Sequence, residues 1–213
     1  MICISAIVAV TFVVSFRETI LLKTGRFMAP EVSQIEYAAD IVILEGTDFI
    51  SRGMVSKGIQ LLSSGKARRM VIVLHRIAPN HRPFAFNEDY SSSVRTELQS
   101  LGFEDSAFDI IVTHIHDPVT LVSARGALEV LSRDGVKSAI LVSPGFHMRR
   151  SFLVYQHLSA PLNIKIYPVA CFDAYELNNW WNQDNGPRDF LSELLKLVFY
   201  MAKGYIPLKF SYY

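Results

Sequence analysis

The sequence contains few cysteines and almost no net charge. Only Cys3 and Cys171 occur among 213 residues, too few for a disulfide framework, and they lack the clustering of a zinc site. The 21 Lys and Arg residues nearly balance the 20 Asp and Glu residues, so the formal net charge is +1. Because the chain has no broad basic field, we predict no nucleic-acid partner.

Several short motifs of nucleotide-binding and hydrolytic enzymes are also missing. The sequence has no Gly-x-Gly-x-x-Gly fingerprint, no Walker A motif and no Gly-x-Ser-x-Gly nucleophile elbow. His114 and His116 alternate near the end of a predicted strand, as zinc ligands can, and Asp117 follows them. Val119 replaces the further histidine of longer metal-binding patterns, so we predict no metal site.

Residues 2–16 carry no charged side chain at all. The stretch is shorter than the ~20 apolar residues that span a bilayer, although residues 19–22 extend it. A short signal-anchor, a cleaved signal peptide and a buried first strand all compete as interpretations. We favour an anchor or signal segment over residues 1–22, because the stretch has no polar face to present to water. A connector over residues 23–37 would follow it.

From residue 38 onward, short apolar runs alternate with amphipathic stretches. Runs over residues 39–46, 68–76, 108–117, 137–145 and 162–171 are typical of buried strands, and helical spacing lies between them. Continuous apolar strands separated by helices predict an α/β fold, a three-layer, doubly wound, mostly parallel sheet of the Rossmann-like kind. We predict one such domain over residues 38–205 and a tail over residues 206–213.

Polar groups follow several of the predicted strands. Ligands of doubly wound sheets bind outside the carboxyl ends of the strands, so these groups form one candidate rim. Backbone N–H groups at a helix start and an arginine suit an anion, and a histidine there suits proton transfer. The spacing does not choose between Arg149 and Arg150. We predict His147 as a catalytic residue and, as ligand-binding residues, Gly46, Asp48, Arg52, Thr120, Ser143, Gly145 and Arg150.

Two stretches carry a family resemblance. They are "ILVSPGFHMRR" at residues 140–150 and the closing pattern of Trp, Glu, Lys, Tyr and Lys-Gly within residues 180–204. With them, residues 38–205 resemble the bacterial YdcF/SanA/ElyC-like domain of unknown function. The resemblance implies a Rossmann-like fold, an N-terminal membrane anchor in many members and, in some, a role in cell-envelope integrity. One branch is reported to bind S-adenosylmethionine.

The match to this family is partial. Gly46, Arg52, Thr120, His147 and Arg150 fall on family positions, and Ser143 matches a small hydroxyl residue. Glu45-Gly46 stands where the family has Gly-Gly, and "LHRIAP" replaces Ser-Gly-Gly after the second strand. Val122-Ser123 replaces Glu-Asn in the third helix, which removes one candidate acid or base.

Together these features predict a membrane-anchored protein of envelope homeostasis. Its partners would be the membrane and an anionic small molecule or lipid-linked glycan, a phosphorylated or lipid-linked sugar that the rim binds or processes. We expect a single pass through the inner membrane with the domain on the periplasmic side. The cations after the apolar segment favour the cytoplasmic side instead. A cytoplasmic nucleoside- or S-adenosylmethionine-binding module and an inactive scaffold are the alternatives, and the reaction and any cofactor are left open.

Overall fold

The computed structural model describes residues 16–32, 35, 37–46, 49–76, 90–114 and 117–207. At its centre lies a five-stranded sheet in the order β3-β2-β1-β4-β5, in which every neighbouring pair is parallel. The prediction of a doubly wound, Rossmann-like α/β fold is confirmed, with an all-parallel sheet. The strands are β1 (Ala39–Glu45), β2 (Ala67–Arg76), β3 (Phe108–His114), β4 (Ser138–Pro144) and β5 (Lys165–Cys171).

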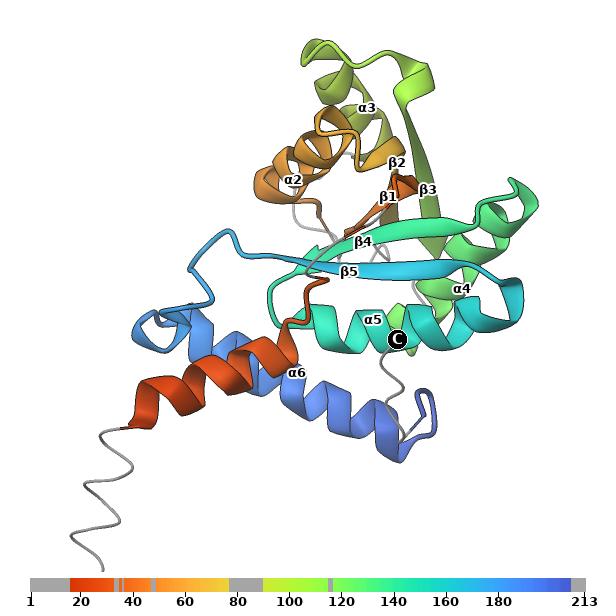
Figure 1. Cartoon of the computed structure of the whole chain (residues 1–213). Helices are drawn as coiled ribbons and strands as arrows, with labels where there is room; N and C mark the ends of the chain where they lie inside the picture. Colours follow the sequence, from red (N-terminus) through yellow and green to blue (C-terminus); the bar gives the residue numbers. More distant parts are fainter. Residues whose placement is uncertain are drawn as a thin grey trace, which may run out of the picture.

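Helices cover both faces of the sheet (Figure 1). On one face α2 (Arg52–Ser63) and α3 (Tyr90–Ser100) pack on the sheet, and on the other α4 (Val119–Arg133) and α5 (His147–Ser159) do so. The last helix, α6 (Asn185–Ala202), packs against α5, outside the second layer. Short 3₁₀ turns η2 (Asp105–Ala107), η3 (Ala160–Leu162) and η4 (Trp180–Asn182) complete the described elements.

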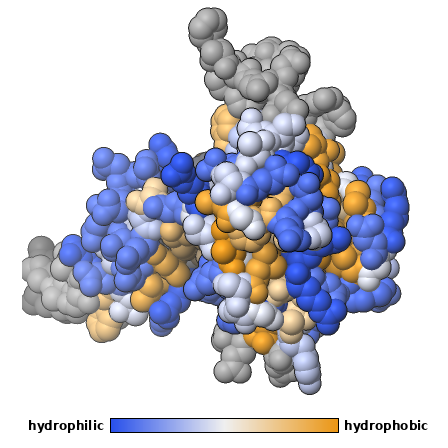
Figure 2. Space-filling model, turned by 90° about the horizontal axis from the view of Figure 1, so that it is seen from above, coloured by the Kyte–Doolittle hydropathy of each residue, from blue (hydrophilic) through white to orange (hydrophobic). Residues whose placement is uncertain are grey.

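The strands are apolar throughout because both of their faces are buried. Ile41 and Ile43 of β1 belong to the core under α4, α5 and α6, whereas Val42 and Leu44 belong to the core under α2 and α3. Burial of each such side chain contributes about 1.5–3 kcal/mol. Seen from above, hydrophobic residues still reach the surface in a band between two hydrophilic lobes (Figure 2).

The strand order sets the position of the ligand site. From β1 the chain passes through α2 to β2 on one side, and the crossover through α4 returns it to β4 on the other side of β1. Strand order therefore reverses between β1 and β4, whose residues pair from Ile41 with Ala139 to Leu44 with Val142. In open parallel sheets this switch point leaves a crevice at the carboxyl ends of the strands.

Residues 16–28 form a helix ahead of the sheet. The indole Nε1 of Trp180 donates a hydrogen bond to the Leu21 carbonyl at 3.2 Å, and Arg149 Nε donates to the Phe27 carbonyl at 2.5 Å. Most of the predicted anchor, residues 1–15, lies outside the described residues, and residues 23–28 of the predicted connector are helical. Within the ranges that the structure describes, no helix has the length and apolar character needed to cross a membrane.

Candidate functional site

A cleft of about 910 Å³ lies at the carboxyl ends of the strands. The starts of three helices border it: Ser51 and Met54 at α2, Val119 and Thr120 at α4, and His147 at α5. This convergence follows from the topology, because each of these helices begins where a parallel strand has just ended. Each helix start carries a partial positive charge. The Asp173 carboxylate already lies at the start of α2, so the starts of α4 and α5 are the ones that favour an anion in the cleft.

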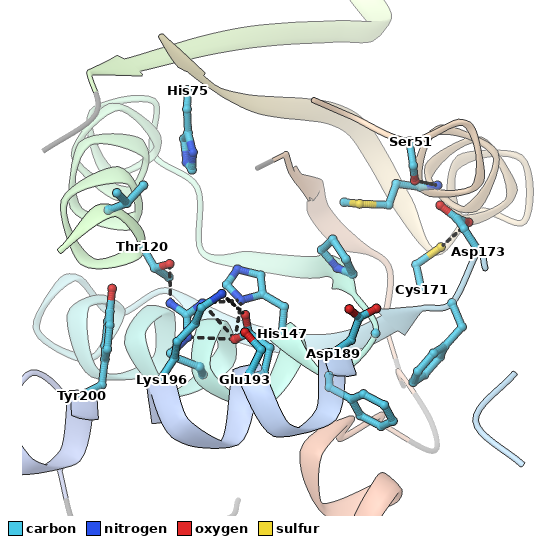
Figure 3. A pocket seen from close by; sticks show the side chains of 18 of the residues that line it. Ser51, His75, Thr120, His147, Cys171, Asp173, Asp189, Glu193, Lys196 and Tyr200 are labelled. Carbon is cyan, nitrogen blue, oxygen red and sulfur yellow. Dashed lines mark hydrogen bonds and ion pairs between the residues drawn. The ribbon is translucent and has the colours of Figure 1, made fainter. Parts of the chain in front are cut away.

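Thr120, His147 and Glu193 lie close together at one end of the cleft (Figure 3), and Arg150 joins them in one polar network. Its Nε donates to Glu193 Oε2 at 3.0 Å, and its Nη1 donates to the Thr120 hydroxyl at 2.7 Å. Its Nη2 lies 2.8 Å from His147 Nδ1, and the guanidinium lies 4.9 Å from the centre of the Tyr200 ring. Arg150 is only 5% exposed, so it acts mainly as an internal brace that joins α4, α5 and α6.

His147 lies between two carboxylates. Its Nδ1 is 3.1 Å from Glu193 Oε2, and its Nε2 is 3.7 Å from Glu45 Oε2. Glu45, the last residue of β1, is buried and accepts a hydrogen bond from the Ser151 hydroxyl. A histidine held at both ring nitrogens and lining a cleft can give or take a proton in a fixed orientation.

The carboxyl of Glu193 is strongly perturbed. Burial raises its pKa, but the hydrogen bond and charge of His147, with the charge of Arg150, lower it by more. The Lys196 ammonium, which donates to Glu193 Oε1 at 2.9 Å, acts in the same direction. The net result is a pKa well below the ordinary value, so Glu193 is a carboxylate at any physiological pH.

Two buried hydroxyl groups, those of Ser143 and Tyr155, do not form a hydrogen bond with each other. Among the described residues, neither the Ser143 hydroxyl nor the Tyr155 hydroxyl has a hydrogen-bond partner. Burial raises the pKa of Tyr155, and the charge of Glu45 raises it further. Tyr155 therefore stays protonated and adds no charge next to Glu45.

The other end of the cleft is aromatic. The Phe146 ring lies 5.4 Å from that of Phe172 and 6.0 Å from that of Tyr175, whose hydroxyl donates to Asp189 at 3.2 Å. Cys171 lies 3.6 Å from an Asp173 oxygen, and burial, followed by the Asp173 charge, raises the pKa of its thiol to about 12. A thiol in this state is a poor nucleophile, so this end offers surface for packing rather than covalent chemistry.

Four of the predicted site residues line the cleft: Thr120, Gly145, His147 and Arg150. Gly145 has a φ of +36°, and a Cβ there would lie 3.2 Å from the Phe172 ring. The turn between β4 and α5 thus needs glycine for its conformation and for the fit of an aromatic wall.

The other predicted residues are not among those that line it. Gly46 donates a hydrogen bond to the Val73 carbonyl at 3.0 Å, so its close approach is to β2 rather than to a ligand. Arg52 is exposed at the start of α2, and Ser143 is fully buried within β4. Asp48 lies outside the described residues.

The structure distinguishes the two adjacent arginines. Arg150 enters the network in the cleft, whereas the Arg149 guanidinium lies 4.3 Å from the centre of the Phe27 ring on the N-terminal helix. Both are nearly buried, at 5% and 3% exposed. Consecutive helical positions point about 100° apart, so one arginine serves the cleft and the other holds the N-terminal helix.

The predicted set lacks the residues that α6 contributes. Glu193, Lys196 and Tyr200 recur at intervals of three and four, so they lie on one face of α6, and all three line the cleft. Two carboxylates, Glu45 and Glu193, supply the acidic groups that Val122-Ser123 do not. A polar stripe at helical spacing, within a helix whose other faces are apolar, was the available signal.

The part of the chain described here contains no group of three or more His, Cys, Asp or Glu side chains placed to hold a metal ion. The side chains of His114 and His116, where the zinc-like pattern occurs, lie outside that part. His75 lines the cleft, and its Nε2 lies 3.0 Å from the Ser123 hydroxyl.

No protein-family model matches this sequence, and no curated protein matches it. Among solved structures, it is similar to two of pantothenate synthetase from Thermus thermophilus, both at 10% identity. The first has a TM-score of 0.39 and covers 72% of this chain and 61% of its own, so the chain spans about three fifths of that protein. The second has a TM-score of 0.38 and covers 85% of this chain and 75% of its own.

Proposed function

We propose that the protein binds an anionic small molecule, a phosphorylated or lipid-linked sugar, in this cleft and that His147 exchanges a proton with it. The observation that carries the proposal is the convergence of the starts of α4 and α5 with His147 and Lys196 on a single cleft. Helix starts, a lysine and a histidine are the groups with which proteins meet phosphates and carboxylates.

Lys196 is the better candidate for direct contact with the anion. Arg150 already donates to Glu193 and Thr120, and its charge is balanced by a buried carboxylate. The Lys196 side chain is 54% exposed, and its ammonium can leave Glu193 Oε1 for a ligand oxygen. Arg52, predicted to share the clamp with Arg150, does not line the cleft, so the proposal gives its part to Lys196.

The proton chemistry is assigned to His147. Nδ1 lies within hydrogen-bond distance of both Glu193 and Arg150, so it donates to Glu193 when it carries a proton and accepts from Arg150 when it does not, and Glu45 lies beyond Nε2. Glu193 stays ionised and so gives the ring an acceptor in a fixed place, as a carboxylate does for a catalytic histidine. In this scheme the two glutamates are positioning residues and His147 is the acid or base.

The resemblance to the YdcF/SanA/ElyC-like family supplies the biological setting of the proposal. It supports envelope homeostasis, an anchor in the inner membrane and a domain on the periplasmic side, with a lipid-linked sugar as a fitting ligand. Fusion of a periplasm-active reporter to the C-terminus tests the orientation. Reporter signal supports this setting, and a silent reporter places the domain in the cytoplasm.

Ligand binding is tested by calorimetry with inorganic phosphate and glucose 1-phosphate. We expect the Lys196→Met variant to bind about tenfold or more weakly, because a lost charge-assisted hydrogen bond costs about 1.5–3 kcal/mol. Lys203→Met is the matched control, since this lysine follows the end of α6 and does not line the cleft. Equal affinities for the wild type and Lys196→Met would remove the proposal.

A nucleoside is the second candidate ligand, favoured by the aromatic end of the cleft. Phe172 and Tyr175 offer faces on which a base can stack, and Asp189 offers an acceptor for a hydroxyl. S-adenosylmethionine, which is cationic, tests this idea. Its binding should be weakened by Phe172→Ala and unaffected or improved by Lys196→Met, the reverse of the pattern expected for a phosphorylated sugar.

A further inference from the structure

The outer face of α6 is apolar and exposed, whereas its inner side carries polar residues of the cleft and the buried core residue Leu197. Leu191, Leu195 and Val198 are 57%, 71% and 55% exposed, and their spacing of four and three places them along one stripe. The opposite face carries Glu193 and Tyr200, which are buried against the rest of the domain. Large apolar side chains gathered on one exposed face mark an interaction surface rather than random surface composition.

The N-terminal helix, residues 16–28, belongs to the same layer. Trp180 joins the two helices, because its Nε1 donates to the Leu21 carbonyl and its ring stacks on Phe190 of α6 at 4.7 Å. Both helices lie on the side of α5 that faces away from the sheet (Figure 1). Ile20 is 47% exposed on the N-terminal helix, which adds a second apolar point to this layer.

Cations flank these apolar side chains. Arg188 and Lys203 lie near the two ends of α6, and the Arg188 side chain is 71% exposed. Lys23 and Arg26 are exposed on the N-terminal helix. Apolar stripes bordered by lysine and arginine are typical of helices that lie in the interface of an anionic bilayer.

We propose that the outer face of α6, together with the N-terminal helix, lies on the surface of a bilayer that contains anionic lipids. Fifteen uncharged residues, 2–16, lead directly into that helix, so the chain arrives at this layer from its most lipid-compatible segment. A second copy fits less well. The stripe from Leu191 to Val198 is only about 10 Å long, and a specific dimer buries about 1,000 Å² or more.

This contact shares residues 16–22 with the anchor expected over residues 1–22, adds the outer face of α6 to it and does not depend on the proposed ligand. The contact also suggests how a lipid-linked ligand would reach the cleft, and this one step rests on the proposed function. Because the inner face of α6 lines the cleft through Glu193, Lys196 and Tyr200, the same helix would meet the lipid and the ligand. A lipid-linked ligand could then reach the cleft from the membrane surface.

The test places an environment-sensitive fluorophore on the outer face of α6 in the full chain. Leu195→Cys is labelled in a Cys3→Ser, Cys171→Ser background, and Leu101→Cys is the matched control. Leu101 is 56% exposed in the turn after α3, on the opposite side of the sheet. With vesicles of phosphatidylcholine and phosphatidylglycerol in equal parts, we expect the Leu195→Cys probe to gain intensity and shift to shorter wavelength, and the control probe to do neither.

Two outcomes would overturn the proposal. In one, the Leu195→Cys probe stays in a water-like environment while sedimentation shows the chain on the vesicles, which would leave residues 2–16 as the whole membrane contact. In the other, the probe responds to protein concentration without vesicles, which would identify a second copy as the partner.

A second variant tests the charge component without changing the apolar stripe. Arg188→Glu with Lys203→Glu should weaken binding to the mixed vesicles by about tenfold or more, because each cation near an anionic surface contributes about 1 kcal/mol. Binding to pure phosphatidylcholine should change little. Equal binding of this variant and the wild type to the mixed vesicles would overturn the anionic-lipid part. Ligand affinity in the cleft, measured without vesicles, is independent of both results.

Discussion

The junctions β4–α5 and β1–α2 are built alike but serve the cleft differently. Each is a strand that ends at the switch point, a glycine-bearing turn and a helix with an arginine near its start. The β4–α5 junction places Gly145, His147 and Arg150 in the cleft. The β1–α2 junction places Gly46 against β2 and Arg52 in solvent.

The length of each turn explains the difference. Only two residues separate β4 from α5, so His147 and Arg150 lie one helical turn apart on the rim itself. Six residues, 46–51, separate β1 from α2, and the Ser51 hydroxyl caps the helix by accepting from the Met54 amide at 3.2 Å. A β-carbon on Gly53 would lie 1.5 Å from an Asp173 carboxylate oxygen, so the chain's own anion already occupies this helix start.

The comparison shows that a position at the end of a strand brings a residue near the cleft but does not decide whether its side chain points into it. Glu45, inside β1, reaches His147 across the switch point, whereas in the turn that follows Gly46 contacts β2 and the cleft is lined by Phe49 and Ser51. On the β1 side, the residue that joins the polar network, Glu45, therefore lies in the strand. On the β4 side, His147 and Arg150 lie in the helix.

The largest expected effect on stability separates the two arginines, Arg150 and Arg52. Arg150→Met should lower the free energy of unfolding by about 3 kcal/mol, because it breaks the buried pair with the Glu193 carboxylate and leaves Glu193 with His147 and Lys196 alone. Arg52→Met should change it by less than about 0.5 kcal/mol, as expected for an exposed side chain outside any network. Urea unfolding followed by circular dichroism measures both. Losses of equal size would mean that the two junctions are equivalent after all.

A smaller effect is expected at the two glycines. Gly145 has a positive φ, and the β-carbon of Gly145→Ala would lie 3.2 Å from the Phe172 ring. Gly46→Ala would bring a β-carbon within 2.8 Å of the Val73 carbonyl oxygen. Each should cost about 1–3 kcal/mol of unfolding free energy.

The two variants should separate in ligand affinity rather than in stability. Only Gly145→Ala should weaken the binding of glucose 1-phosphate measured by calorimetry, because its β-carbon displaces the Phe172 wall and the start of α5. If Gly46→Ala weakened binding to the same degree with no larger loss of stability, the glycine of the β1 turn would belong to the site.

Most of the fold was predictable from the sequence. Five apolar runs of strand length, each followed by helical spacing, specify the parallel sheet, because only strands covered on both faces are apolar throughout. Helix boundaries were less well defined. Residues 16–28 are helical, although their sequence reads as part of an anchor and a connector, because Arg149 and Trp180 supply partners from distant segments. Such long-range contacts leave no local pattern.

The site was predictable in position but only partly in membership. Thr120, His147 and Arg150 follow predicted strands, so the topology alone brings them together. Glu193 and Lys196 lie more than forty residues after His147, on a helix that packs outside the sheet layers. Because they do not follow a strand, the position of the strand ends does not predict that they belong to the site. The direction of Arg149 depended on the helical phase of α5, which a start uncertain by one residue leaves open.

The final prediction compares the two edges of the β1–β4 pair through their acidic residues. Glu193 contacts His147 beyond the carboxyl edge, and its lowered pKa means that its ionised form is stabilised in the folded state. That contribution is fully present above the unfolded-state pKa of about 4.3 and is lost as the pH falls toward the folded-state value. The stability difference between the wild type and Glu193→Gln should therefore narrow below about pH 4.

Asp40, at the amino edge, is the control for this pH dependence. Its carboxylate accepts from the Lys137 amide at 2.9 Å and the Ser138 amide at 3.0 Å, and the Lys137 hydrogen bond is the main cause of its lowered pKa. The sign and the pH window are the same. The effect of Asp40→Asn should be smaller, because the side chain is 32% exposed and an amide oxygen can still accept both bonds. A larger acid dependence for Asp40→Asn would make the carboxylate at the amino edge, and not the one in the cleft, the larger contributor to acid-dependent stability.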